Sequence, residues 1–204
     1  IGMPASLSMI IMSSGILIYN IILDSNDAVA AYQTAGRVEH LFFLPIISIA
    51  TALVTLVGMF SGANRIDLVK EIVKYGLTRS VAISILFSIF FSIFNRQIIS
   101  VFTDDPNIIT HAVEYFSVLV FAYPFITIGM TCSRIMQGLG YGTPTLILTI
   151  LRVVVINSAF AWFFVIIQGK PVIFAWYSLL ISSSITSVVS ILWMRSKMKS
   201  FSLV

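Results

Sequence analysis

The chain has 204 residues, of which 58% are hydrophobic and 10% are charged, whereas soluble domains average about 45–50% apolar and about 25% charged residues. This composition excludes a soluble globular protein. The net charge of +4 is spread thinly, which excludes a nucleic-acid-binding face, and the single Cys132 with two distant histidines indicates no metal centre.

Long apolar runs fill nearly the whole chain. A helix needs about 20 apolar residues to cross a bilayer, and the uncharged or nearly uncharged runs satisfy this requirement six times. We therefore predict an all-α integral membrane protein, a bundle of six transmembrane helices at about residues 2–23, 28–61, 77–100, 108–137, 144–168 and 171–194.

Prolines mark several of the predicted helix starts, because proline at the first helical position loses no needed hydrogen bond. Pro106 follows the N-cap candidate Asp105. Pro45 and Pro124 instead fall inside the second and fourth spans, where each is expected to kink its helix. Between the second and third spans, the pattern from Ile66 to Lys74 predicts a short amphipathic helix at the membrane surface.

Basic residues separate cleanly between alternate loops. The loop after the second span and the segment after the sixth hold seven of them, against two on the opposite side. By the positive-inside rule we expect both ends of the segment in the cytoplasm. The chain also begins at Ile1, directly at the start of a span, so we interpret it as a piece of a longer membrane protein.

Ionisable residues inside a bilayer are costly and usually face a bundle interior or a wet cavity. In the second span, Gln33, Arg37 and His40 share one helical face, while Glu39 points elsewhere together with Tyr32. For His40 the alternative is an ordinary hydrogen-bonded interior histidine.

The fourth span carries a polar and aromatic stripe made of Tyr123, Thr127, Met130, Arg134 and Gln137. With Met12 and the face of Gln33, Arg37 and His40, this stripe is the candidate substrate-binding surface. For two of the arginines there is an alternative: Arg134 reaches the lipid headgroups, and Arg152 in the fifth span bonds to backbone carbonyls.

An intramembrane charge network is the second candidate site, made of Arg37, Glu39, Glu114, Arg134 and Arg152. Arg37 and Glu114 lie at nearly equal depths, so we predict that they approach each other, directly or through water, with His40 as the other neighbour of Glu114. The alternative is that Arg37 bonds to carbonyls freed by a kink while Glu114 reaches the outer solvent.

Enzyme chemistry is the competing class of function. An intramembrane hydrolase needs a nucleophile with a base in reach or two neighbouring acids. His40 and His111 are the available histidine bases, and no span carries two acids one turn apart. We therefore expect no enzyme activity, and a structural membrane subunit is the remaining alternative of a different class.

Five short motifs occur in a characteristic order. They are GMPAS from Gly2, AAYQ from Ala30 with RVE at 37–39, GMFSGANR from Gly58, FTDD from Phe102, and MQGLG from Met136 with Pro144. In this order and spacing the chain resembles the C-terminal six-helix half of the multidrug and toxic compound extrusion (MATE) transporters.

The resemblance implies one half of a twelve-helix antiporter with a pseudo-twofold axis, whose N-terminal half is absent here. It implies export of amphipathic or cationic drugs through a cleft between the halves, in exchange for sodium ions or protons. It implies no cofactor beyond that coupling ion, and a location in the plasma membrane of a prokaryote. A lipid-linked precursor flippase of the same superfamily is the alternative.

The sequence departs from one branch of the resembled family. That branch has acids at the positions of Met12 and, in the fourth span, near Ile126, and neither position is acidic here. The resemblance therefore implies that the coupling ion binds mainly in the absent N-terminal half.

Overall fold

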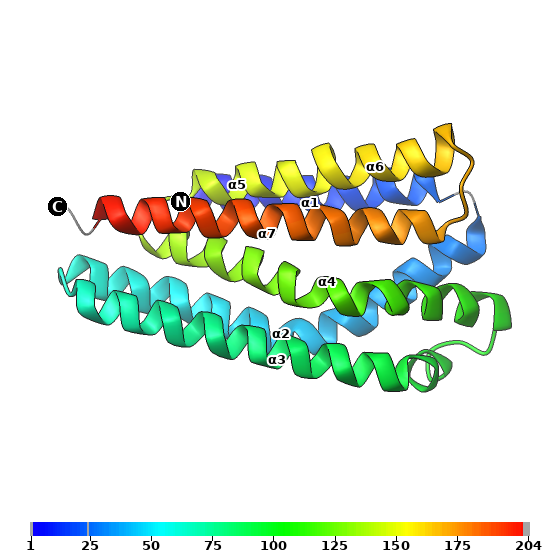
Figure 1. Ribbon diagram of the computed structural model, residues 1–204, viewed down its shortest axis with the longest axis horizontal. Helices are drawn as coiled ribbons and strands as arrows, with labels where there is room; N and C mark the ends of the chain where they lie inside the picture. Colours follow the sequence, from blue (N-terminus) through cyan, green and yellow to red (C-terminus); the bar gives the residue numbers. More distant parts are fainter. Residues whose placement is uncertain (1, 24, 202–204) are drawn as a thin grey trace.

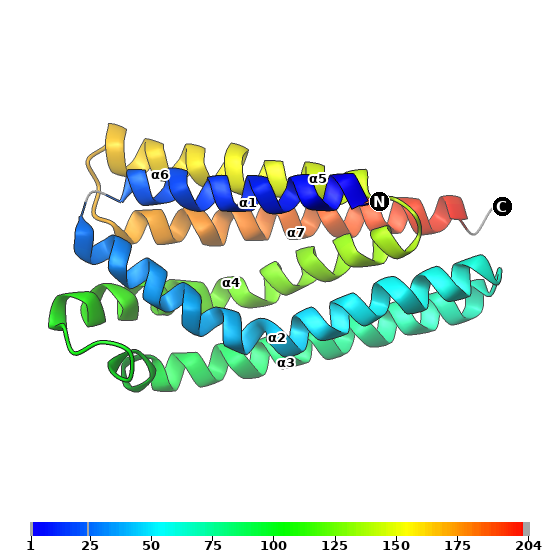
Figure 2. The ribbon, with the colours of Figure 1, turned by 180° about the vertical axis from the view of Figure 1, so that it is seen from behind.

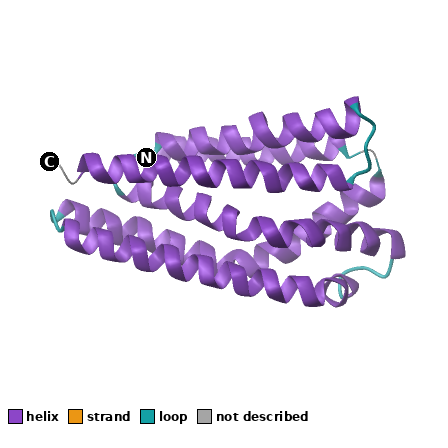
Figure 3. Cartoon of the chain, in the orientation of Figure 1, coloured by secondary structure: helices purple, strands orange, loops and turns teal. Residues whose placement is uncertain are grey.

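A computed structural model describes residues 2–23 and 25–201, and these residues are helical with short connections and no strands (Figure 3). The helices are α1 (Gly2–Ile22), α2 (Asn26–Gly62), α3 (Ile66–Ser100), α4 (Pro106–Gly138), α5 (Thr143–Thr149), η1 (Ile150–Ser158), α6 (Ala159–Trp162), η2 (Phe163–Ile167) and α7 (Ile173–Phe201). The predicted all-α bundle is thus confirmed.

Within the described residues, five continuous helices are long and apolar enough to cross a membrane. One of them joins α5, η1, α6 and η2 from Thr143 to Ile167, so that these four elements form a single rod. The first helix has a shorter apolar stretch, Ser6–Ile22. Together they account for the six predicted spans.

Helix α4 lies at the centre of the bundle. It contacts α2 and α3 on one side and α7 and α5 on the other, and Figure 1 shows it between these two groups. Figure 2 shows α1 in front of the rod formed by α5 to η2. Because α4 has neighbours on nearly all sides, buried residues occur all around it rather than on one stripe.

The start of α1, the α2–α3 and α4–α5 connections and the end of α7 lie at the same end of the bundle (Figure 1). We call this the basic end, because the elements that meet there carry a set of basic residues near it: Arg65, Lys70, Lys74, Arg195 and Lys197. The opposite end holds the connections at residues 101–105 and 168–172.

One sequence prediction about the basic end is wrong. The segment from Ile66 to Lys74 is not a separate surface helix but the first turns of α3, which continues without a break to Ser100. Val69 and Val73 are buried against the neighbouring helices while Lys70 and Glu71 are exposed. The apolar face that suggested a membrane-surface helix therefore packs inside the bundle.

Local capping explains two of the helix starts. The Asp105 side chain accepts a hydrogen bond of 2.9 Å from the backbone N–H of Asn107, with Pro106 as the first helical residue, as predicted. Ser25 accepts a bond of 3.1 Å from the N–H of Ala28 at the start of α2. These caps fix where α2 and α4 begin.

Candidate functional site

Glu39 is held between two tyrosines in the interior of the bundle. Its carboxylate, on α2, accepts hydrogen bonds from the hydroxyls of Tyr123 at 2.6 Å and Tyr115 at 3.0 Å, both on α4. The two tyrosines lie about two turns apart on the same face of α4. Hydrogen bonds to a charged group are stronger than neutral ones, so this three-residue cluster ties α2 to α4.

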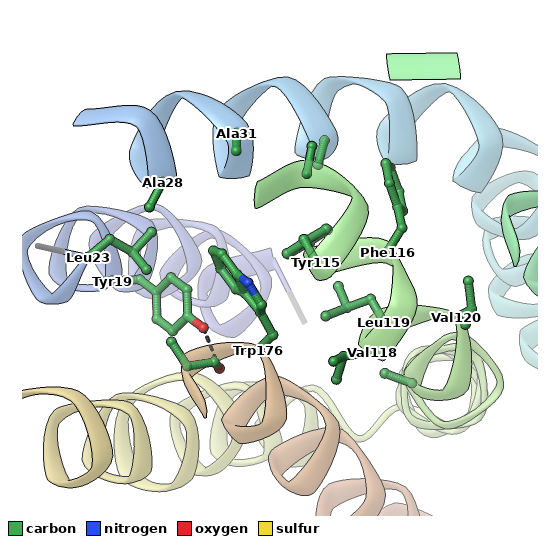
Figure 4. Packing of buried hydrophobic residues seen from close by; sticks show 14 of the residues in the cluster. Tyr19, Leu23, Ala28, Ala31, Tyr115, Phe116, Val118, Leu119, Val120 and Trp176 are labelled. Carbon is green, nitrogen blue, oxygen red and sulfur yellow. Dashed lines mark hydrogen bonds between the residues drawn. The ribbon is translucent and has the colours of Figure 1, made fainter. Parts of the chain in front are cut away.

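Aromatic rings close the site toward α1 and α7. The Tyr32 ring stacks on Trp176 with centroids 6.1 Å apart, and the Tyr115 ring meets Trp176 edge to face at 5.0 Å. Figure 4 shows Trp176 between Tyr19 and Tyr115, with the Tyr19 hydroxyl bonded to the backbone carbonyl of Ala175. The indole N–H of Trp176 is buried and has no hydrogen-bond partner.

A second group of rings covers the side of the site toward α3. Phe91 of α3 is stacked on Phe116 with centroids 5.0 Å apart, and it also contacts the Tyr123 ring at 5.7 Å. Phe43 of α2 meets the same tyrosine at 5.4 Å. Both tyrosines that bond to Glu39 therefore pack against other aromatic rings: Tyr115 against Trp176, and Tyr123 against Phe43 and Phe91.

Arg152, on the rod formed by α5 to η2, is the cationic residue near Tyr32. It lies in η1, a π-helical stretch, and is half-buried; such stretches are uncommon and often occur at functional sites. Arg152 and Glu39 both act electrostatically on Tyr32. Within the described chain, however, the contacts closer than 4.0 Å between basic nitrogens and carboxylates are Arg65–Asp67 and His111–Glu114, so Glu39 and Arg152 form no direct pair.

Arg37 and Glu114 thus form no direct ion pair, whereas their predicted approach through water stays a prediction. The Glu114 carboxylate contacts the ring of His111, one turn earlier on α4, at 3.4 Å. Arg37 lies on the exposed face of α2. Equal depth along two helices does not by itself bring two side chains together, because it leaves the face that each side chain occupies undefined.

The predicted substrate-binding residues fall into two groups. Met12, Gln33, Arg37 and His40 are exposed on α1 and α2, and Gln33 donates a hydrogen bond of 3.2 Å to Asn20 of α1. Tyr123 and Thr127 are buried in the core, and Met130 is half-buried. The assignment of the α4 stripe to an open surface is thus corrected, because α4 is central in the bundle.

The remaining members of the predicted charge network lie apart from Glu39. Arg134 donates a hydrogen bond of 3.1 Å to the side chain of Gln137, near the basic end of α4. No group of three or more His, Cys, Asp or Glu side chains suited to a metal ion occurs in the described part of the chain. The interior cluster of Glu39, Tyr115 and Tyr123 is the polar site that the structure assembles between α2 and α4.

The sequence shows Glu39 inside the second span but indicates no hydrogen-bond partner for it. The signal that could have found the cluster is the position of Ala31, Ala35 and Val38, which mark the buried face of α2, with Glu39 at its edge. A carboxylate beside that face needs donors from a neighbouring helix, and tyrosines spaced by two turns on the fourth span supply them.

Comparison with known proteins identifies the fold family. A family model described as MatE matches residues 4–163. The chain belongs to the MatE family. Its curated relatives include the protein named "Probable multidrug resistance protein NorM" of Thermotoga maritima, which is 26% identical over 155 residues, covering 75% of this chain and 33% of that protein.

Solved MatE structures agree with this assignment. A MOP superfamily transporter from Pyrococcus furiosus superposes with a TM-score of 0.93 at 26% identity, over 99% of this chain and 46% of that one. A MATE structure in the straight conformation gives a TM-score of 0.94 at 25% identity, over 100% and 46%. The chain thus spans about half the length of the transporters it matches.

Proposed function

We propose that this MatE chain is the C-terminal half of a secondary multidrug antiporter, which exports amphipathic or cationic compounds in exchange for sodium ions or protons. The observation that carries the proposal is the superposition of 100% of this chain on 46% of an outward-facing multidrug resistance MATE transporter, with a TM-score of 0.93. In this function the substrate is moved without chemical change, and the coupling ion is transported rather than held as a cofactor.

The partner in this proposal is the N-terminal half of the same transporter. A broad apolar surface on α1 supports it, with Met3, Met9, Ile10, Leu17 and Ile21 each more than half exposed. Next to it, the exposed polar residues of α2, Gln33, Arg37 and His40, provide a mixed surface suited to amphipathic cations. Lipid covers the remaining outer surface.

A flippase for lipid-linked precursors receives no support from the cations. Such a cavity needs clustered positive charges for an anionic headgroup. Arg37 is exposed on α2, Arg152 lies in η1, and Arg134 is bonded to Gln137 near the basic end. The cations are thus spread over three helices, which favours the drug exporter.

Efflux of a fluorescent cation tests the proposed function. We expect the full-length transporter in proteoliposomes to move ethidium when one of two gradients, of sodium ions or of protons, is imposed. In secondary antiport the inward flow of that ion supplies the energy for export. Efflux is measured as the time course of ethidium fluorescence, with an identical preparation lacking any gradient as the control. Absence of efflux under both gradients would contradict the proposal.

We further propose that the basic end lies in the cytoplasm of a prokaryotic cell, because basic residues favour that side of the plasma membrane. Cysteine replacements at Ala63, in the exposed α2–α3 connection, and at Asp104, near the opposite end, report the orientation. Cys132 is buried, so this half contributes little background. In intact cells an impermeant maleimide should label Asp104→Cys and spare Ala63→Cys; the reverse pattern would overturn the topology.

A further inference from the structure

An open apolar groove runs between α2 and α3 on the outside of the bundle. It has a volume of about 400 Å³ and is lined by Phe42 of α2 and by six apolar residues of α3 between Leu86 and Phe94. The two helices contact each other and lie side by side in Figures 1 and 2. Because every lining side chain is a leucine, an isoleucine or a phenylalanine, the groove suits an apolar occupant.

Aromatic rings form the base of this groove. The Phe42 ring meets Phe87 and Phe90 of α3 with centroids 5.5 Å and 5.6 Å apart. It also contacts the buried Phe91 at 4.7 Å, and Phe90 in turn contacts Phe94 at 5.2 Å. Rings that pack edge to face and tilted against one another hold a defined arrangement, so the groove keeps its shape.

The exposed face of α3 is more apolar than its buried face. Leu86, Ile89 and Ile93 are 65%, 56% and 61% exposed, whereas Ser80 and Ser84 are fully buried. Hydrating such a face with water is costly, so hydrocarbon is the medium that suits it. Figure 1 shows α3 across α4 from α1, the helix whose apolar surface we propose for contact with the N-terminal half. The groove therefore faces lipid.

One end of the groove lies next to a positive charge along the chain. Arg96 follows Phe94 by two positions and is exposed, and no carboxylate of the described chain lies within 4.0 Å of its side chain. The acids at that end are Asp104 and Asp105, and the second of these caps α4. A guanidinium binds phosphate oxygens through paired hydrogen bonds, so Arg96 is suited to a phosphate.

The depth of Arg96 agrees with a headgroup position. Residues 80–95 of α3 carry no charge and extend about 24 Å at 1.5 Å per residue, somewhat less than the hydrocarbon layer of about 30 Å. Arg79 and Arg96 bound this run, so they lie near the two headgroup layers. The Arg79 guanidinium carbon lies 5.2 Å from the centre of the Tyr75 ring, and Arg79 is seven positions from Leu86. Arg96 is thus the arginine closer to the groove.

We propose that this groove binds a phospholipid with an anionic headgroup, which places one acyl chain along the rings of α2 and α3 and its phosphate at Arg96. The single positive charge of Arg96 complements the net negative charge of phosphatidylglycerol, whereas phosphatidylcholine carries its own cation beside the phosphate. The lipid belongs to the leaflet opposite to the basic end. This site requires only that α2 and α3 cross a membrane, so it is independent of the exported substrate.

Photocrosslinking from the lipid tests the site. The full-length transporter is reconstituted into phosphatidylcholine nanodiscs with a small amount of phosphatidylglycerol that carries a diazirine group on one acyl chain. The residues labelled after irradiation are identified by mass spectrometry, and we expect label on Leu86, Ile89 and Ile93. Phosphatidylcholine with the same diazirine chain should label them about fivefold less, the difference expected for one arginine beside an anionic lipid.

Arginine variants test the position of the phosphate. Arg96→Gln should lower labelling by the phosphatidylglycerol probe to the level of the phosphatidylcholine probe, while Arg96→Lys should keep most of it. Arg79→Gln is the matched control at the other end of the same uncharged run and should leave labelling unchanged. If Arg79→Gln lowers the labelling and Arg96→Gln does not, the lipid enters from the other leaflet and the proposal is wrong.

A larger side chain in the groove tests the position of the acyl chain. Ile89→Trp should reduce the labelling of Leu86 and Ile93 by both probes. Leu192→Trp, at a residue of α7 that is 61% exposed, should leave that labelling unchanged. Equal labelling by both lipids that Arg96→Gln does not alter would mean bulk lipid only and would overturn the proposal. Because Arg96 is exposed, this last comparison remains decisive even where Ile89→Trp fails to fold.

Discussion

Replacing Gly138 by alanine should destabilise the bundle by about 1–3 kcal/mol, the usual cost of overpacking a tight contact. A Cβ atom at Gly138 would lie 2.8 Å from the backbone carbonyl oxygen of Val54 and 2.9 Å from the Cβ of Val57. Neither atom sits at the end of a flexible side chain, so α2 and α4 must move apart. The measurement is the melting temperature of the purified full-length transporter, which should fall by several degrees.

Gly129 provides the matched control on the same helix. A Cβ atom there meets nothing within 4 Å, and alanine favours the helix over glycine by up to about 1 kcal/mol. Gly129→Ala should therefore leave the melting temperature unchanged or raise it slightly. Equal losses in both variants would mean that the close approach of α2 and α4 at Gly138 does not limit stability.

Replacing Trp176 by alanine should cost about 3–5 kcal/mol, as is typical for a fully buried tryptophan. Its side chain is 0% exposed and contacts the rings of Tyr19, Tyr32 and Tyr115. The loss leaves a cavity where α1, α2, α4 and α7 meet. Thermal unfolding of the full-length transporter should show a large drop in melting temperature, together with lower expression.

Two tryptophan controls make this result specific. Trp162→Ala removes a side chain that is 52% exposed and should have little effect. Trp176→Phe keeps a ring in the cluster and removes an indole N–H that has no hydrogen-bond partner, so it should retain most of the stability. If Trp176→Ala were no worse than Trp162→Ala, the aromatic cluster would not hold the four helices together.

Helix positions were largely predictable because membrane crossing demands length and apolarity, and because Asp105 with Pro106 mark a start. The first turns of α3 could not be predicted from an apolar run. The charges at Lys70 and Lys74 interrupt the apolar run, and only the packing of Val69 and Val73 shows that the helix continues through them.

The site was less predictable than the fold. Helical periodicity shows which residues share a face, as for Tyr123 and Thr127, but not which neighbour that face meets. Because α4 is surrounded by other helices, Tyr123 of its polar stripe lies inside the bundle and bonds to Glu39, together with Tyr115, which the stripe did not include. Arg37 and Glu114 were expected to pair because they lie at similar depths in the membrane, but depth does not show which face of its helix a side chain occupies.

The lengths of α2 and α3 have a consequence for the lipid environment. With 37 and 35 residues, the two helices extend about 55 Å and about 52 Å at 1.5 Å per residue. The hydrocarbon layer of a bilayer is about 30 Å thick, and even with the headgroups it reaches about 45 Å. A tilt of about 20° shortens their span across the membrane by only a few ångströms.

These helices therefore pass through the headgroup layer and continue into water at one end or both. Polar residues occupy both ends of α3, with Lys70 and Lys74 at one and Asn95 and Arg96 at the other. A bilayer that becomes a few ångströms thinner or thicker only moves its boundary along these polar turns. Helix α3 thus tolerates small changes in membrane thickness at these polar turns.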